Sequence, residues 1–142
     1  MEIHQSAVTL LLVLSASFTS QESPYEKFVR QHVGPDMNEH KCDTEIRDKE
    51  IHYPGPEKHC KKKNTFIQAD EAHIKTVCGT GGKKQSGNLY KSSTPFPVIT
   101  CELLNPDKHP NCKYKGKKST PYIILACNGG LPVHYEKEDE AE

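Results

Sequence analysis

The order of apolar and polar residues divides the chain into three parts. Residues 7–14 are a nearly unbroken apolar block. From about residue 25 to 78, apolar residues recur mainly at the 3.6-residue spacing of helices. Further along they fall in short segments with the two-residue period of strands. Short helices followed by short strands predict one α+β domain with an antiparallel sheet.

The N-terminal block predicts a secretory signal peptide over residues 1–20. It is too short to span a bilayer as a helix, and the small residues after it suit cleavage near residues 17–20. The alternative is a buried N-terminal helix. No later apolar run is long enough for a membrane helix, so we expect a secreted, soluble mature chain of about 120 residues without membrane insertion.

Three short helices are predicted in the first half. Ser23 and Glu26, with a proline between them, have the pattern of a capping box, and a Gly-Pro pair ends this helix. A second helix is expected from residue 36 or 38 to about residue 49. Asp70 is a candidate cap for a third helix that reaches about residue 78.

Strands are predicted where β-branched and aromatic residues cluster between Gly, Pro and Asn turns. These segments are residues 89–90, 96–100, 122–127 and 131–135. The stretch Gly79–Lys84 lacks the four-residue gap of a phosphate-binding loop, so it is interpreted as a flexible turn.

The six cysteines all lie in the expected mature part of the chain. An even number in an oxidising compartment indicates three disulfides, but six cysteines allow 15 pairings and the count cannot choose among them. A zinc site is the alternative. It is disfavoured because no Cys-x-x-Cys or Cys-His pair has the spacing of a zinc finger.

Charge separates the domain from its C-terminus, although the whole chain is neutral. Residues 21–135 contain 18 Lys and Arg against 13 Asp and Glu, a net charge of +5, and residues 136–142 form an acidic tail. A basic body suits an anionic partner such as RNA or a glycosaminoglycan, and solvated surface charge is the alternative explanation. With only 34% hydrophobic residues, a domain of this size depends on its disulfides.

Histidine is the expected catalytic group, since neither a metal pattern nor a free thiol is expected. Five of the seven histidines after residue 20 lie among charged or turn residues and are interpreted as surface residues. His32 is expected on the inner edge of the first helix, and His134 lies in a predicted strand. Each alone could be a structural histidine. Lys61–Lys63, which precede another predicted strand, could stabilise negative charge or form a plain basic patch.

Three separated segments together resemble a known family. Lys27-Phe-Val-Arg-Gln-His32, Cys60-Lys61-x-x-Asn64-Thr65-Phe66 and Pro132-Val-His134 are similar, in this order, to the signature segments of the pancreatic ribonuclease (ribonuclease A) superfamily. The cysteine positions and the segment Cys127-Asn-Gly-Gly-Leu-Pro-Val-His134 resemble its six-cysteine, angiogenin-like branch. The resemblance covers residues 25–135.

The resemblance implies a fold and a disulfide pairing. The fold is ribonuclease A-like, with three short helices on a curved, V-shaped antiparallel sheet and the active site in its cleft. The implied disulfides are Cys42–Cys101, Cys60–Cys112 and Cys78–Cys127.

The resemblance also implies a mechanism, in which the ribose 2′-hydroxyl of single-stranded RNA attacks the adjacent phosphorus on the 3′ side of a pyrimidine. His32 would act as the base and His134 as the acid, Lys61 would stabilise the charge, and no metal or cofactor would take part. The implied substrate-binding residues are Gln31 at the phosphate, Thr65 at the pyrimidine, and Asn64 and Tyr135 beside them. The family's usual Asp two residues after the acid is Glu136 here.

Two function classes stay open at this point. One is a secreted endoribonuclease, expected to act as a monomer. The other is an angiogenin-like or host-defence protein with weak ribonuclease activity that binds heparan sulfate or another cell-surface or microbial ligand. This second class depends on Arg47, Lys49 and Lys61–Lys63, and a ribonuclease inhibitor is a further candidate partner. The acidic tail would either stay solvated or fold over the cleft and reduce turnover.

Overall fold

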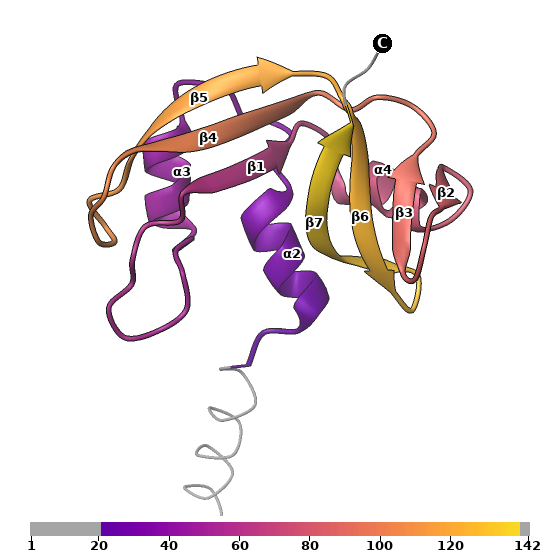
Figure 1. Ribbon diagram of the computed structural model, residues 1–142, viewed down its shortest axis with the longest axis horizontal. Helices are drawn as coiled ribbons and strands as arrows, with labels where there is room; N and C mark the ends of the chain where they lie inside the picture. The colour runs from indigo at the N-terminus through magenta and orange to yellow at the C-terminus, as the bar shows by residue number, and fades with distance from the viewer. Residues whose placement is uncertain (1–20, 140–142) are drawn as a thin grey trace, which may run out of the picture.

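Two antiparallel sheets meet at an angle in the computed structural model, which describes residues 21–139 and the side chains as far as Glu136 (Figure 1). The predicted signal peptide and residues 140–142 of the tail lie outside the described residues. The first sheet has the strand order β1-β4-β5, with bounds Lys63–Ile67, Val98–Asn105 and Lys113–Ser119. The second has the order β2-β3-β6-β7, with bounds Gly82–Lys84, Leu89–Ser92, Tyr122–Asn128 and Leu131–Asp139.

Helix α2, Pro24–His32, forms as the sequence predicts. The Ser23 hydroxyl accepts the Glu26 backbone N–H, and the Glu26 carboxylate accepts the Ser23 N–H, which completes the capping box. Phe28 and His32 face inward. The helix contacts both β1 and β7 and lies where the two sheets come together (Figure 1). At its end, His32 contacts Thr65 of β1 and Tyr135 of β7.

The second helix is shorter than predicted: α3 spans Cys42–Asp48. Residues 35–41 form turns instead, because the Asn38 side chain accepts the His40 N–H and offers the backbone an alternative to the helix. The third helix begins after its Asp70 cap as α4, Glu71–Lys75, and tightens into the 3-10 helix η1, Thr76–Cys78.

Several strand features differ from the sequence-based expectation. Strand β5 was not predicted, and β2 includes the last residues of the supposed flexible turn. Strand β4 begins at Val98 and continues to Asn105, and β7 continues to Asp139. The first residues of the acidic tail are therefore paired with β6 and extend the domain past residue 135.

The three disulfides pair as the resemblance implies. Cys42–Cys101 joins α3 to β4, Cys60–Cys112 joins the segments before β1 and β5, and Cys78–Cys127 joins η1 to β6. They reinforce two apolar clusters, one between α2 and the second sheet and one between α3 and the first sheet. The expected α+β class, with short helices on antiparallel sheets and three disulfides, is confirmed.

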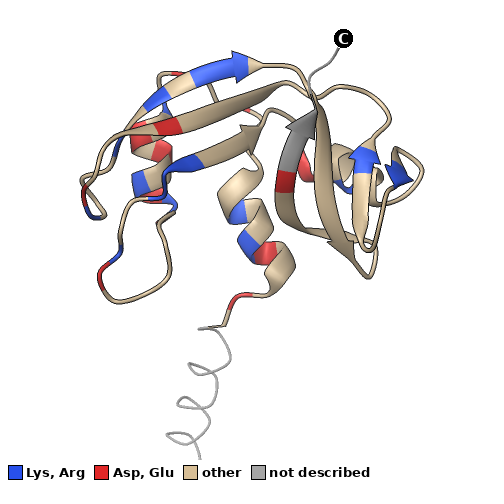
Figure 2. Cartoon of the chain, viewed as in Figure 1, with Lys and Arg blue, Asp and Glu red and all other residues tan. Residues whose placement is uncertain are grey.

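Lysines concentrate on particular elements of this frame. Figure 2 shows basic residues along β5, at the start of β1, and on β2 and β3. No helix within residues 21–139 is both long and apolar enough to cross a bilayer.

Candidate active site

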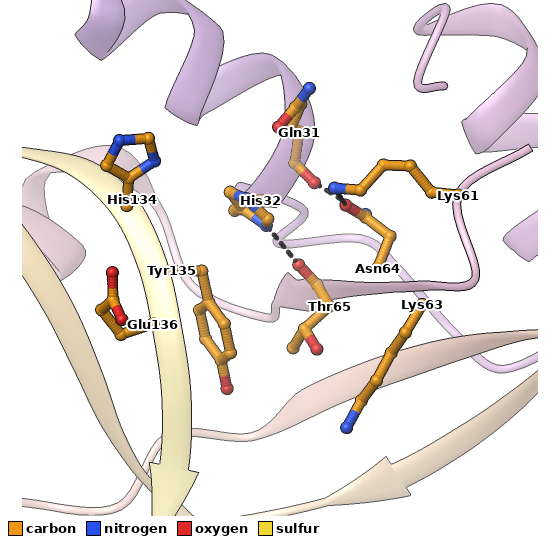
Figure 3. Close-up of a pocket in the computed structure, with 9 residues that line it drawn as sticks. All are labelled: Gln31, His32, Lys61, Lys63, Asn64, Thr65, His134, Tyr135 and Glu136. Atoms are coloured by element: carbon orange, nitrogen blue, oxygen red, sulfur yellow. Dashed lines mark hydrogen bonds between the residues drawn. The ribbon is translucent and has the colours of Figure 1, made fainter. Parts of the chain in front are cut away.

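One pocket collects every residue that the sequence singled out as a candidate. It lies where α2, β1 and β7 approach one another (Figure 3). Its lining consists of the seven predicted site residues and two more, Lys63 and Glu136: Gln31, His32, Lys61, Lys63, Asn64, Thr65, His134, Tyr135 and Glu136. Residues about 100 positions apart in the chain are thus brought together by the fold.

His32 is fixed in one tautomer by the backbone of β1. Its Nδ1 lies 2.8 Å from the Thr65 carbonyl oxygen, which can only accept a hydrogen bond, so Nδ1 carries the proton and neutral His32 has its lone pair on Nε2. The residue is only 9% exposed. Burial, together with the charges of Lys61, His134 and Lys27, lowers the pKa of His32 to about 4, although the bond to Thr65 opposes the shift. The Nε2 atom of His32 can therefore accept a proton at neutral pH.

Asn64 forms hydrogen bonds to both the Lys61 ammonium and the backbone of helix α2. Its Oδ1 accepts the Lys61 ammonium at 3.0 Å, and its Nδ2 donates to the Gln31 carbonyl oxygen at 2.9 Å. Asn64 is 2% exposed, so both bonds are shielded from water. Burial, with the charges of Lys27 and Arg30, lowers the pKa of Lys61. Lys61 is therefore a half-buried, oriented cation rather than a free surface lysine.

Replacing Asn64 should weaken catalysis more than its distance from the reacting atoms suggests. We expect Asn64→Ala to lower kcat by about 10- to 100-fold, since a hydrogen bond to a charged group contributes about 1.5–3 kcal/mol. Single-turnover kinetics would measure this loss. Gln68→Ala is the matched control, because Gln68 also donates to a backbone carbonyl oxygen, that of Met37, outside the pocket. An equal loss of kcat in both variants would assign Asn64 a purely structural role.

The β1 ladder turns both backbone groups of Thr65 toward α2 and the pocket. In an antiparallel pair the N–H and C=O of one residue point the same way. Because the Thr65 carbonyl accepts His32, its N–H also points away from β4. The Thr65 hydroxyl lies 3.5 Å from that of Thr100. Thr65 thus offers an outward donor beside a hydroxyl that can donate or accept.

Strand β7 supplies the opposite wall. The Tyr135 ring stacks on His32 with a centroid distance of 5.6 Å, and His134 is exposed to solvent. Glu136 is on the same side of β7 as His134, and no hydrogen bond joins the two side chains in Figure 3. Among the described residues, no group of three or more His, Cys, Asp or Glu is placed to hold a metal ion.

The comparisons with known proteins decide the family. A sequence profile described as "Pancreatic ribonuclease" matches residues 23–136, which is most of the chain. The chain belongs to the pancreatic ribonuclease family. It is an endoribonuclease, which confirms the enzyme class predicted from the sequence, and RNA is its substrate.

Named relatives agree with this assignment. "Ribonuclease-like 3" of Danio rerio is 43% identical over 145 aligned positions, which cover 96% of this chain and 97% of the relative. "Angiogenin" of Mus musculus is 30% identical and covers 89% and 86% of the two chains. The X-ray structure of zebrafish RNase5 superimposes with a TM-score of 0.76 at 49% identity, covering 80% of this chain and 93% of that one.

Lys63 is the pocket residue whose position the sequence reasoning undervalued. In the sequence analysis, Lys61–Lys63 were considered only together, as a source of charge stabilisation or as a plain basic patch. Strand alternation is the signal that places it, since residues 63 and 65 of one strand share a face. By contrast, Arg47 pairs with Asp48, and Lys49 donates to the Val33 carbonyl oxygen. Arg47 is exposed with an exposed partner, and Lys49 is partly buried; we propose no cell-binding function on these two cations.

Proposed function

We propose that this ribonuclease is secreted and cleaves single-stranded RNA on the 3′ side of pyrimidines. The observation that carries the proposal is the His32 Nδ1 bond to Thr65, because it leaves a neutral, buried imidazole nitrogen free to accept a proton in a pocket shared with Lys61 and His134. The six cysteines joined as disulfides and the apolar N-terminal block favour an oxidising, extracellular location.

The first step forms one bond and breaks one. His32 Nε2 takes the proton of the ribose 2′-hydroxyl, the 2′ oxygen bonds to phosphorus, and the bond from phosphorus to the 5′ oxygen breaks. His134 gives a proton to that leaving oxygen, and the products are a 2′,3′-cyclic phosphate and a free 5′-hydroxyl. Lys61 and Gln31 hold the phosphoryl oxygens as negative charge develops. Water then opens the cyclic phosphate with the two histidines in reversed roles.

Base preference depends on the donor and hydroxyl of Thr65. The outward N–H suits the O2 acceptor that both uracil and cytosine carry, and the hydroxyl suits N3, which donates in uracil and accepts in cytosine. The Tyr135 ring, stacked on His32, gives the base a flat apolar neighbour. A purine, with its larger ring system, would not fit the same contacts.

The test uses a short fluorescent oligonucleotide in which a single uridine is the only ribonucleotide, here called the uridine substrate. We expect turnover that is unchanged by a chelator, lost when the uridine is replaced by deoxyuridine, and strongly reduced when it is replaced by riboadenosine. Failure to cleave the uridine substrate, by protein with intact disulfides, would refute the proposal. Equal cleavage at adenosine would refute the role of Thr65 alone.

A further inference from the structure

Two histidines outside the catalytic pocket form a close pair. His52 lies in the segment between α3 and β1, and His109 lies in the segment between β4 and β5. Their ring centroids are 5.0 Å apart, and the ring planes are tilted by 46°. Both residues are partly buried. The sequence analysis interpreted them as surface residues, but the fold brings them together.

The two segments that carry these rings are joined to each other. The His109 N–H donates to the Lys58 carbonyl oxygen at 2.8 Å, so the backbone of one segment is bonded to that of the other. The Cys60–Cys112 disulfide links the same two segments. The ring pair therefore belongs to a part of the fold that is held by both a covalent bond and backbone hydrogen bonding.

His52 makes the hydrogen bond that is typical of a metal ligand. Its Nδ1 lies 2.8 Å from the Tyr53 carbonyl oxygen, which can only accept, so Nδ1 carries the proton. The lone pair of the neutral His52 ring is then on Nε2. A histidine that binds a metal almost always donates its other ring N–H to a carbonyl or a carboxylate, which fixes the tautomer and orients the ring.

His109 has a buried nitrogen that lacks a partner. Its Nδ1 is shielded from solvent and makes no hydrogen bond to the described residues. A buried polar atom of this kind needs an explanation, and a bound ion is one. Burial, and then the charges of His52 and Lys58, lower the pKa of His109, while Glu50 opposes the shift. The ring is therefore neutral at neutral pH, which is the form that binds a metal.

The spacing of the two rings suits a single ion. Two imidazoles on one tetrahedral zinc, each with a Zn–N bond of about 2.1 Å, have ring centroids about 5 Å apart. The 5.0 Å between the His52 and His109 centroids agrees with this value. Imidazole nitrogen is a ligand that Zn²⁺, Cu²⁺ and Ni²⁺ all accept. Since no group of three His, Cys, Asp or Glu is placed for a metal within the described residues, water would complete the coordination.

We propose that His52 and His109 bind one zinc ion, or another divalent ion that prefers imidazole, through Nε2 of His52 and Nδ1 of His109. The ion adds a link between the two segments beside the Cys60–Cys112 disulfide, and so stabilises the folded state. It takes no part in RNA cleavage. The proposal is therefore independent of the proposed function and agrees with turnover that a chelator does not change.

A structural explanation of the same pair makes a different prediction. Two neutral imidazoles can pack against each other without an ion, and a buried water can satisfy His109 Nδ1. In that case zinc would not distinguish this pair from the other histidines, and a change at His109 would affect stability equally with and without zinc.

The experiment titrates the disulfide-bonded protein with zinc alone and compares wild type with His52→Asn and His109→Phe. Asparagine can keep the bond to the Tyr53 carbonyl through its Nδ2, but it has no nitrogen at the Nε2 position. Phenylalanine keeps a ring and removes both nitrogens. His59→Asn is the matched control, because His59 is an exposed histidine of the same segment whose Nε2 is hydrogen-bonded to Glu57.

NMR of the histidine ring nitrogens identifies the atoms that zinc binds, and denaturant unfolding measures the gain in stability. We expect shifts at His52 Nε2 and His109 Nδ1. At a free zinc concentration of about 100 times the Kd, the folded-to-unfolded ratio of wild type should rise about 100-fold. Each variant should bind at least about tenfold more weakly, since even second-shell changes cost that much, and gain about tenfold or less. His59→Asn should match wild type.

Zinc should also reverse an order of stability. Without zinc, His109→Phe removes an unsatisfied buried nitrogen and should be at least as stable as wild type. With zinc, wild type should be the more stable of the two. If His109→Phe fails to fold, His52→Asn and the NMR shifts still decide. An equal gain from zinc in wild type and His52→Asn, or shifts confined to His32 and His134 of the catalytic pocket, would overturn the proposal.

Discussion

His32→Asn should lower kcat/KM for the uridine substrate by about 10²–10⁴-fold, because the variant loses the proton acceptor of the first step. Asparagine is chosen because its Nδ2 can occupy the place of His32 Nδ1 and keep the bond to the Thr65 carbonyl. His134→Ala should cause a loss of similar size by removing the acid. His40→Asn, at an exposed site outside the pocket, is the matched control and should retain full turnover.

The pH profile distinguishes a lost base from a general loss of structure. For wild type, the acid limb of kcat/KM reports protonation of His32 in the free enzyme. Because burial lowers the pKa of His32 to about 4, we expect this limb well below the ordinary histidine value of about 6.5. In His32→Asn the acid limb should disappear, and an acid limb that persists unchanged would show that another group is the base.

The same lowered pKa makes the fold sensitive to acid. The folded state excludes a proton that the unfolded chain takes up, so the free energy of unfolding decreases as the pH falls from about 6.5 toward 4. The shift corresponds to at most about 3 kcal/mol. Denaturant unfolding of wild type and His32→Asn at pH 7 and pH 4.5 measures it. The variant should lose less stability on acidification than wild type does.

Local signals in the sequence were sufficient for several elements. The capping box at Ser23 and the cap at Asp70 place two helix starts, because the side chain and the backbone donor that it satisfies are neighbours in sequence. Strand β5 escaped prediction because alternating lysines give an edge strand a polar profile. Its inward contacts are long-range: the Tyr114 N–H donates to Asp43 of α3, and Gly116 packs against Glu39 in the segment before α3. The close approach of Gly116 to the Glu39 carbonyl has no local signature.

In the candidate site, too, some features have a local sequence signal and others depend on contacts between distant segments. Family resemblance was enough to select His32, Lys61 and His134, because their motifs are contiguous in sequence. It could not reveal how they are held, since the Thr65 carbonyl is a backbone group that any residue would provide. The register that places Lys63 opposite Glu102 of β4 is likewise a long-range pairing.

Removal of the Cys60–Cys112 disulfide should damage both stability and the site. We expect Cys60→Ala/Cys112→Ala to lower the free energy of unfolding by about 2–5 kcal/mol, measured by denaturant titration. The disulfide also fixes Cys60, the residue before Lys61. The backbone carbonyl of Lys61 accepts a hydrogen bond from the Tyr114 hydroxyl at 2.7 Å. Once this segment loosens, Lys61 should spend less time in its oriented position, and kcat should decrease under conditions where the variant is still folded.

Cys78→Ala/Cys127→Ala is the matched comparison. The two disulfides close loops of nearly equal length, 52 and 49 residues, so each contributes about 4 kcal/mol in the chain-entropy treatment. Both double variants should therefore lose similar stability, while the larger loss of kcat should accompany removal of Cys60–Cys112.

Lys61→Ala tests whether the loss of kcat in Cys60→Ala/Cys112→Ala comes from Lys61. Added to that double variant, Lys61→Ala should reduce kcat by less than it does in wild type, because part of the contribution of Lys61 is already lost. Full additivity, together with equal kcat in the two disulfide variants, would mean that Asn64 and the backbone orient Lys61 without help from the disulfide.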